Sequence, residues 1–300
     1  MPENTGYRIA AVQMRMGPDE QENQARAVDL VRQAAAQGGQ VICLPELYQW
    51  PYLCQKEDIT LFDLAEPSDG PAVTAFRTLA AELGVAVIVP FFERRGPGLC
   101  HNTAAVIDAD GALLGLYRKM HIPDDPAYYE KYYFAPGDLG FRTFDTAFGR
   151  VAVLICWDQW YPEGARLAAL SGATSLFYPT AIGWHPAEKE QHGALQHNAW
   201  QTVQRGHAVA NGIYVAAPNR FGLERPYADL PGIEFWGGSF IAGPQGELVA
   251  EASSDNEEVL VSEVDTVHLE EVRRNWPFFR DRRVDAYGGL TRRWLDGSPE

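Results

Sequence analysis

Three residues of this 300-residue chain have side chains that could act together in nucleophilic chemistry: Glu46, Lys119 and Cys156. A thiol attacks well at neutral pH only with help, and a carboxylate held beside it can take its proton. Attack on a carbonyl then produces an oxyanion. A fixed ammonium and a backbone N–H, here that of Trp157, can stabilise this oxyanion by several kcal/mol. The combination requires no histidine.

Each of the three residues follows a segment that the apolar pattern predicts to be a strand. Cys156 follows the apolar run 151–155, and Pro162 then favours the first turn of a helix. Glu46 follows residues 41–44, and Lys119 follows residues 113–118. Strand ends in α/β architectures face the ligand crevice, so we expect the three side chains to face such a crevice.

Two of these residues also have a purely structural interpretation. Free cysteine is among the most buried residue types, so Cys156 could be part of the core. Glu46 fits an exposed loop glutamate or one that caps a helix. The local patterns alone leave both interpretations open.

The rest of the pattern predicts the same order of elements in the two halves of the chain. The first half has predicted strands at 7–14, 41–44 and 85–91, helices at 20–36 and 71–83, and a hairpin of 101–107 with 113–118. The second half has strands at 151–155, 175–178 and 214–218, a helix from 162, a helix at 195–210, a hairpin of 238–242 with 248–250, and a strand at 259–264. This pseudo-repeat of α-β-β layers predicts one α/β domain over residues 1–300, with its core at about 7–265.

The composition narrows the class of protein. The net charge of −15 argues against nonspecific nucleic-acid binding and mildly favours cationic small molecules. The four cysteines show neither zinc nor disulfide spacing, and the histidines lack ligand spacing, so we expect no metal and a cytoplasmic protein. Without a signal-peptide pattern or ~20 consecutive apolar residues, we expect no contact with a membrane.

Four motifs together make the chain resemble the nitrilase superfamily of carbon–nitrogen hydrolases. They are LPEL around Glu46, YRKMHIP around Lys119, YYEKYYFAPGD around Glu130 and ICWDQWYPE around Cys156. The resemblance implies a four-layer α-β-β-α sandwich, no cofactor, and association into dimers or larger assemblies. It also implies that Glu46, Lys119 and Cys156 are catalytic, with Glu130 in support.

Further motifs resemble the branch of this superfamily that hydrolyses N-carbamoylputrescine in polyamine synthesis. They are WD after Cys156, FYPTAIG at 177–183, RGHAVAN at 205–211, FWGGSFIAGPQGE at 235–247 and the tail WPFFRDRR. The resemblance implies a cationic N-carbamoyl amine as substrate and the free amine, carbon dioxide and ammonia as products. Asp124 or Asp125 and the rings of Tyr52 and Trp157 could bind its cationic end. The two aspartates, beside Pro126, fit a solvated turn equally well.

Other functions remain open at this point. An N-carbamoyl amino acid hydrolase of the β-ureidopropionase or D-carbamoylase type would need an arginine for the substrate carboxylate, and an aliphatic amidase or nitrilase would share the mechanism. A non-catalytic assembly protein of the same fold would be expected to lack the glutamate, lysine or cysteine.

Two irregular segments suggest further roles. Residues 48–69 are aromatic and lack a regular pattern, as is typical of pocket walls and lids. The arginines and aromatic residues of 276–283 could clamp single-stranded nucleic acid, but the net charge opposes this. We therefore expect the tail, 266–300, to lie at a subunit interface, with Arg280, Arg282 and Arg283 paired to carboxylates.

Overall fold

The computed structural model describes residues 6–295 and residue 297, and two successive halves of the chain repeat one order of elements. The first half contains β1 (Gly6–Gln13), α1 (Glu20–Ala36), β2 (Val41–Cys43), η1 (Leu53–Gln55), η2 (Ile59–Leu64), α2 (Pro71–Leu83), β3 (Ala86–Gly96), β4 (Leu99–Ile107), β5 (Leu113–Arg118) and α3 (Glu130–Tyr133). The second half contains β6 (Thr143–Asp145), β7 (Arg150–Val153), η3 (Cys156–Trp160), α4 (Pro162–Leu170), β8 (Ser175–Phe177), β9 (Gly183–Trp184), α5 (Lys189–Asn211), β10 (Tyr214–Ala217), β11 (Phe221–Glu224), β12 (Ile233–Trp236), β13 (Phe240–Ala242) and β14 (Leu248–Glu251). The chain then continues through β15 (Glu258–Asp265), α6 (Thr266–Asn275), η4 (Val284–Ala286) and η5 (Gly288–Thr291).

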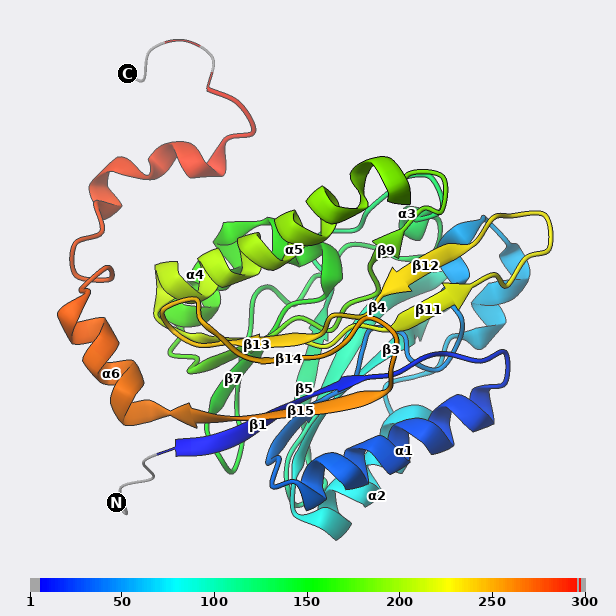
Figure 1. The fold of residues 1–300 in the computed structure, drawn as a ribbon, viewed down its shortest axis with the longest axis horizontal. Helices are drawn as coiled ribbons and strands as arrows, with labels where there is room; N and C mark the ends of the chain where they lie inside the picture. The colour runs from blue at the N-terminus through cyan, green and yellow to red at the C-terminus, as the bar shows by residue number, and fades with distance from the viewer. Residues whose placement is uncertain (1–5, 296, 298–300) are drawn as a thin grey trace.

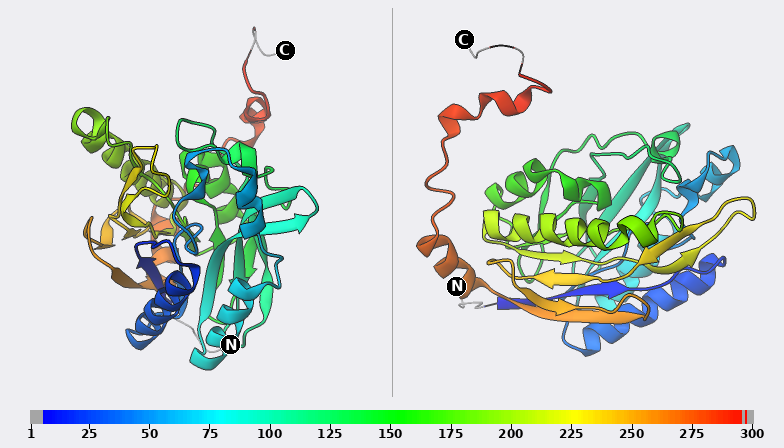
Figure 2. Two further views of the ribbon diagram at one scale, coloured as in Figure 1. Left: turned by 90° about the vertical axis from the view of Figure 1, so that its right-hand side faces the viewer. Right: turned by 45° about the horizontal axis from the view of Figure 1, so that its top comes forward.

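The strands form two large sheets and one small one. The first sheet has the order β15-β1-β2-β3-β4-β5, and the second has the order β14-β13-β10-β8-β7-β6. In both sheets the strands that alternate with helices pair in parallel, and the hairpins add antiparallel strands at the edges. Helices α1 and α2 cover the outer face of the first sheet, and α4 and α5 cover that of the second (Figures 1 and 2). The predicted four-layer α-β-β-α sandwich is therefore confirmed.

Strand β1 shows how the layers are held together. Ile9 and Ala11 belong to the core between the two sheets, whereas Ala10 and Val12 pack with α1 and α2. This division follows from the period of two along a strand, because successive side chains point to opposite faces. The Tyr7 hydroxyl also joins the sheets, lying 2.8 Å from both Thr174 Oγ1 and Ser175 Oγ.

Local capping explains why two helices match their predicted bounds. Helix α1 begins after Asp19, whose side chain accepts a hydrogen bond from the Glu22 N–H at 3.1 Å. Helix α2 begins with Pro71 and ends at Gly84, whose φ of 66° suits glycine. Both signals are local, so the sequence pattern could locate them.

Other elements depart from the prediction. Strand β7 ends at Val153, two residues before its predicted end. Hydrogen bonding to the neighbouring chain segment continues past this point, because the Leu154 N–H donates to the Phe177 carbonyl and the Cys156 N–H to the Pro179 carbonyl, both at 2.9 Å. Helix α5 begins at Lys189, six residues before its predicted start. The apolar pattern missed these first turns because they are polar and solvent-exposed. The small sheet β11-β12-β9 was not predicted, since its strands have only two to four residues.

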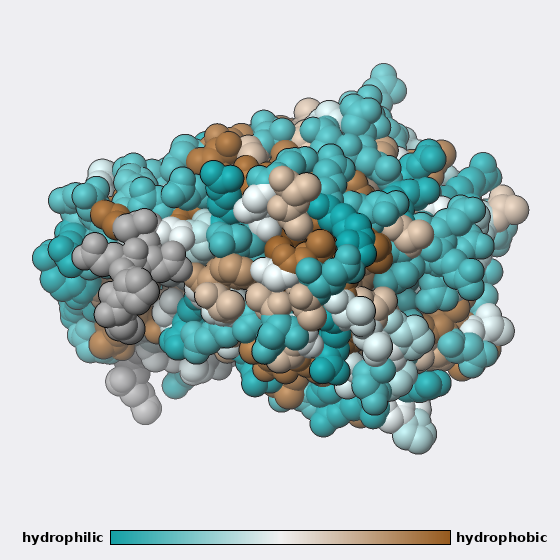
Figure 3. Space-filling view, turned by 90° about the horizontal axis from the view of Figure 1, so that it is seen from below, coloured by the Kyte–Doolittle hydropathy of each residue, from teal (hydrophilic) through white to brown (hydrophobic). Residues whose placement is uncertain are grey.

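The chain leaves the sandwich after α6. Residues 276–295 run outside the layers (Figures 1 and 2), but Phe279 still packs against the hydrophobic core, with its ring 5.4 Å from the guanidinium carbon of Arg166 in α4. The side of the molecule where α1 and α2 lie presents mainly hydrophilic residues with small separate apolar patches (Figure 3). Within the described ranges, no helix has the length and apolar character needed to cross a membrane.

Candidate active site

The Lys119 ammonium lies at the centre of a buried cluster of charges. Lys119 directly follows β5, and its Nζ donates to Glu46 Oε1 at 2.8 Å and to Glu130 Oε2 at 2.7 Å. All three side chains are at most 1% exposed. Burying charges without partners costs several kcal/mol per ion, so this mutual pairing is what allows three ionisable groups to occupy the interior.

Glu46 lies in the turn after β2. The next residue, Leu47, has a φ of 47°, which is unusual for a residue with a side chain. Glu46 Oε1 also accepts a hydrogen bond from Asn102 Nδ2 at 2.7 Å, whereas the buried Oε2 has no hydrogen-bond partner among the described residues. One carboxylate oxygen is thus engaged by donors, and the other is free to accept a proton.

Glu130, the first residue of α3, holds Lys119 from the opposite side. Its Oε1 accepts a hydrogen bond from the Tyr52 hydroxyl at 2.6 Å, and its Oε2 accepts the bond from Lys119. The two oxygens therefore have different donors, which restricts the orientation of the carboxylate. Glu130 in turn restricts the position of the ammonium.

Cys156 is the first residue of η3 and has a strained backbone conformation just after β7. Its φ is 43°, and its Sγ lies 3.8 Å from the Ala181 carbonyl oxygen. Because helical turns leave their first N–H groups without intrahelical acceptors, the Trp157 N–H at the start of η3 is available to an oxyanion beside the sulfur.

The buried Asp158 carboxylate holds this turn in place. Its Oδ2 accepts hydrogen bonds from the Ile155 N–H at 2.9 Å and the Tyr117 hydroxyl at 2.6 Å. Its Oδ1 accepts from the N–H of His121 at 2.9 Å and lies 2.7 Å from His121 Nδ1. Asp158 thereby connects the turn that carries Cys156 to the segment that carries Lys119, two residues before His121.

Burial and neighbouring charges set the protonation states. Burial, together with the Glu46 carboxylate, raises the pKa of the Cys156 thiol well above its ordinary value, and Lys119 offsets only part of this. Burial alone would lower the pKa of Lys119, but the carboxylates of Glu130 and Glu46 raise it well above its ordinary value. Burial also raises the pKa of Glu130, against the effect of Lys119. At neutral pH the thiol is therefore protonated and the lysine charged, so attack by this sulfur would need a base.

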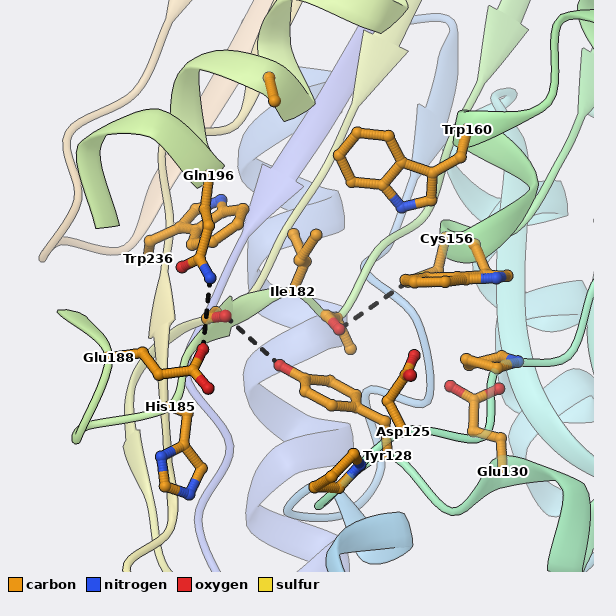
Figure 4. A pocket seen from close by; sticks show the side chains of 16 residues that line it. Asp125, Tyr128, Glu130, Cys156, Trp160, Ile182, His185, Glu188, Gln196 and Trp236 are labelled. Atoms are coloured by element: carbon orange, nitrogen blue, oxygen red, sulfur yellow. Dashed lines mark hydrogen bonds between the residues drawn. The ribbon is translucent and has the colours of Figure 1, made fainter. Parts of the chain in front are cut away.

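A cavity of about 590 Å³ opens beside Cys156. Its walls combine aromatic side chains, such as Tyr128, Trp157 and Trp160, with the carboxylates of Asp125 and Glu188. Figure 4 shows Cys156 and Glu188 on opposite sides of this space, with Glu188 hydrogen-bonded to Gln196 Nε2 at 3.4 Å. The volume suits a small organic molecule.

Of the four residues predicted to contact substrate, two line the cavity and two do not. Trp157 and Asp125 line the cavity. Among the described residues that line it, neither Tyr52 nor Asp124 occurs: Tyr52 is fully buried and bonds Glu130, and Asp124 is exposed to solvent. The position of Tyr52 gives it a part in orienting Glu130, because its hydroxyl already has that carboxylate as acceptor.

The sequence patterns did not indicate several residues of this site. Asn102 bridges the two carboxylates from β4, at 2.7 Å from Glu46 and 3.5 Å from Glu130. In the sequence it stands between His101 and Thr103, a polar run at the start of β4 that gives no signal specific to this residue. Glu188 lies in a segment without a regular pattern, and no local signal distinguishes it from other exposed glutamates.

The histidines serve other purposes. His121 bonds Asp158, and His207 Nε2 lies 2.8 Å from the Gln159 carbonyl oxygen. In the described part of the chain, no group of three or more His, Cys, Asp or Glu side chains could hold a metal ion.

Comparison with known proteins identifies the family. The sequence model of the family "Carbon-nitrogen hydrolase" matches residues 8–274. The chain belongs to the carbon-nitrogen hydrolase family. It is 46% identical to the N-carbamoylputrescine amidase of Solanum lycopersicum over 97% of this chain and 96% of that protein. It is 41% identical to the citrullinase of Francisella tularensis, over 96% of this chain and 99% of that protein.

A solved structure agrees with this assignment. The carbon-nitrogen hydrolase from Helicobacter pylori G27 has a TM-score of 0.91 and 43% identity to this chain, covering 96% of this chain and 100% of that one. The protein is therefore a hydrolase of carbon–nitrogen bonds, from a family of thiol-dependent amidohydrolases.

For this carbon-nitrogen hydrolase, the raised pKa of Cys156 predicts how fast the thiol is alkylated at different pH. A raised pKa keeps the proton on sulfur to higher pH, so the thiolate fraction should still be rising in alkaline solution. Iodoacetamide labelling of Cys156, followed by mass spectrometry from about pH 6 to about pH 10, should accelerate throughout without reaching a plateau. Cys156→Ser supplies the background, and a plateau already at neutral pH would contradict the prediction.

Proposed function

We propose that the protein hydrolyses N-carbamoyl amines with a cationic tail, N-carbamoylputrescine in particular, to the amine, carbon dioxide and ammonia. One observation carries the proposal. The cavity that opens at Cys156 contains the carboxylates of Asp125 and Glu188, and its lining within the described residues includes no lysine or arginine. Such a cavity favours a neutral reacting group with a positive tail over a substrate that carries a carboxylate.

In the first step, Glu46 takes the proton of Cys156 on its free Oε2, and the sulfur attacks the carbamoyl carbon. Lys119 and the Trp157 N–H stabilise the oxyanion that forms. The tetrahedral intermediate collapses when Glu46 returns the proton to the NH₂ group. Ammonia leaves, and the amine remains attached as a thiocarbamate on Cys156.

In the second step, Glu46 takes a proton from water, which attacks the same carbon. The bond to sulfur breaks, the thiol regains its proton, and the released carbamic acid separates into the amine and carbon dioxide. Lys119 stays charged even while Glu46 holds the proton, because the Glu130 carboxylate also raises its pKa. Glu130 acts by orienting Lys119.

The two curated relatives differ in the substrates that their names state. Both N-carbamoylputrescine and citrulline contain the ureido group that Cys156 would attack, but citrulline also contains an α-carboxylate. His185 is the one basic side chain among the described residues of the cavity lining. The Asp125 and Glu188 carboxylates would repel the α-carboxylate of citrulline. This repulsion supports the N-carbamoyl amine as the substrate.

Ammonia release from a panel of substrates tests this proposal. We expect the wild-type protein to prefer N-carbamoylputrescine over citrulline, N-carbamoyl-β-alanine and an aliphatic amide. Cys156→Ala should lower the rate by at least about 10³-fold, since it removes the nucleophile. Cys100→Ala, at a buried cysteine outside the cavity lining, is the matched control and should keep most of the activity.

Each alternative has a distinct outcome in the same panel. An unchanged rate for Cys156→Ala would refute the cysteine mechanism. Preference for citrulline or N-carbamoyl-β-alanine would keep the mechanism and refute the proposed substrate.

Within this proposal, Glu188 is the partner of the substrate ammonium. It lies across the cavity from Cys156, and Gln196 Nε2 bonds one of its oxygens (Figure 4). An extended aminobutyl chain with its ureido carbon at Cys156 would direct its ammonium toward that side. Trp160 and Trp236 line the cavity as well and can cover the methylene groups.

Glu188→Gln should therefore raise KM for N-carbamoylputrescine by about three- to tenfold, because losing a partly solvated ion pair weakens binding by about this factor. N-butylurea, which has the same shape without the amine, should show no change in the variant. Glu190→Gln, an exposed neighbour outside the cavity lining, is the matched control. Equal effects of Glu188→Gln on both substrates would contradict an ionic role for Glu188.

We further propose that the C-terminal tail mediates self-association. Beyond α6, the tail (Figure 1) exposes large apolar side chains, including Trp276 at 58% and Trp294 at 77% exposed. Arg280 and Arg283 pair within the tail with Asp281 and Asp285, which lowers the cationic charge available to nucleic acid. A second copy of the chain would bury these apolar groups.

The four free cysteines support a reducing, cytoplasmic location.

The double variant Trp276→Ser/Trp294→Ser should shift the assembly toward smaller species, because it removes the two large exposed rings. Light scattering coupled to size-exclusion chromatography at several protein concentrations gives the mass. Ile59→Ser, equally exposed but outside the tail, should leave the mass unchanged. A wild-type protein that is monomeric at all concentrations would refute this proposal.

A further inference from the structure

The non-glycine residues with positive φ cluster beside the charged site. In the described chain they are Leu47 at 47°, Ala127 at 65° and Cys156 at 43°. One is the nucleophile, one follows Glu46, and one lies three residues before Glu130. Such conformations persist only where surrounding contacts impose them, so each turn needs a structural support.

The support at Leu47 comes from the second half of the chain. Arg220, which precedes β11, is fully buried, and its Nη2 donates to the carbonyls of Glu46 at 2.7 Å and Leu47 at 2.8 Å. Its Nη1 donates to the Trp50 carbonyl at 3.2 Å. One guanidinium thus bonds three carbonyl groups of the turn that contains Glu46.

Glu224 completes this arrangement. Its carboxylate accepts two bonds from Arg220 Nη1, at 3.0 and 2.8 Å, and its Oε2 accepts the Tyr52 N–H at 2.6 Å. The Tyr52 hydroxyl then donates to Glu130 Oε1. The pair therefore bonds the backbone at both ends of the segment 46–52, and through Tyr52 it reaches the second carboxylate around Lys119.

We propose that the buried Arg220–Glu224 pair positions both carboxylates that hold Lys119: Glu46 through its turn, and Glu130 through Tyr52. The proposal rests on the proposed function only in assuming that Glu46 and Glu130 serve the hydrolysis. Neither Arg220 nor Glu224 lines the cavity within the described chain. Both are therefore positioning residues.

An arginine is required for geometric reasons. The guanidinium presents a planar fork of donors, and here the fork serves three carbonyls and a carboxylate at once. The rings of Tyr52 and Phe235 lie 6.0 and 5.2 Å from its central carbon, which also suits a flat cation. A lysine would keep the charge but could not reach all these acceptors.

The test measures kcat and KM on the best-hydrolysed substrate for Arg220→Lys and Glu224→Gln, together with the thermal unfolding midpoint. Both variants should lower kcat by about 10- to 100-fold, because small displacements of a reacting group are costly. KM should stay within about threefold, since the cavity lining is unchanged. Arg225→Lys is the matched control: this exposed arginine bonds the carbonyls of Ala228 and Leu230 and should keep the wild-type kcat.

A double-mutant cycle tests the route through Tyr52. If Arg220 acts on Glu130 through Tyr52, the loss of kcat in Arg220→Lys/Tyr52→Phe should be smaller than the product of the two single losses. A purely structural role would instead lower the unfolding midpoint of Arg220→Lys and Glu224→Gln and leave the kcat of the folded protein at the wild-type value. That result would overturn the proposal.

Two further outcomes are also decisive. If neither Arg220→Lys nor Glu224→Gln folds, Tyr52→Phe, which removes a single oxygen, decides alone, and a wild-type kcat overturns the proposal. If the wild-type protein hydrolyses amides but no ureido compound, the proposed substrate fails. The comparison of variants then proceeds on the amide.

Discussion

The pairing of one ammonium with two carboxylates in the interior is the constraint on which the rest of the site depends. Lys119, Glu46 and Glu130 are almost fully buried, and the cluster has one positive and two negative groups. Further donors lower the cost of burying such a cluster. Tyr52 donates to the Glu130 oxygen that Lys119 does not reach, and Asn102 is a second donor to Glu46 Oε1, so two neutral residues support the charged ones.

The repeated halves explain how this cluster comes to lie beside Cys156. Glu46 and Lys119 follow strands of the first sheet, whereas Cys156 follows a strand of the second. Face-to-face packing of the two sheets brings these strand ends to one place, which neither half could achieve alone. The junction is reinforced on both sides: Arg220 comes from the second half to hold the Glu46 turn, and Tyr117 and His121 come from the first half to bond Asp158.

The parts of the structure that could be predicted are those with local causes. The helical spacing of residues 20–36 and 71–83 predicted two helices whose caps are local, and the apolar runs predicted the sheet strands that lead to Glu46, Lys119 and Cys156. The support of the site has no such local cause. Arg220 bonds a turn 173 residues away, and nothing in the residues around it distinguishes it from a surface arginine. Tyr52 was expected to contact substrate because it is aromatic and lies in an irregular segment, yet its hydroxyl faces Glu130. Glu188 escaped prediction because its place in the cavity depends on the fold of the segment before α5.

The protonated state of Cys156 also bears on the survival of the protein in the cell. Oxidation by peroxide begins at the thiolate, and it proceeds fastest where the sulfur is both ionised and accessible. Here the sulfur is buried, and the neighbouring carboxylates that can activate it also keep its proton in place. A thiolate that is always ionised by pairing with a cation would be more reactive, but it would also be open to oxidation by peroxide at all times. The acidic surroundings of Cys156 therefore predict slow oxidation of the resting thiol, and in the proposed mechanism the sulfur becomes a strong nucleophile only when its proton moves to Glu46.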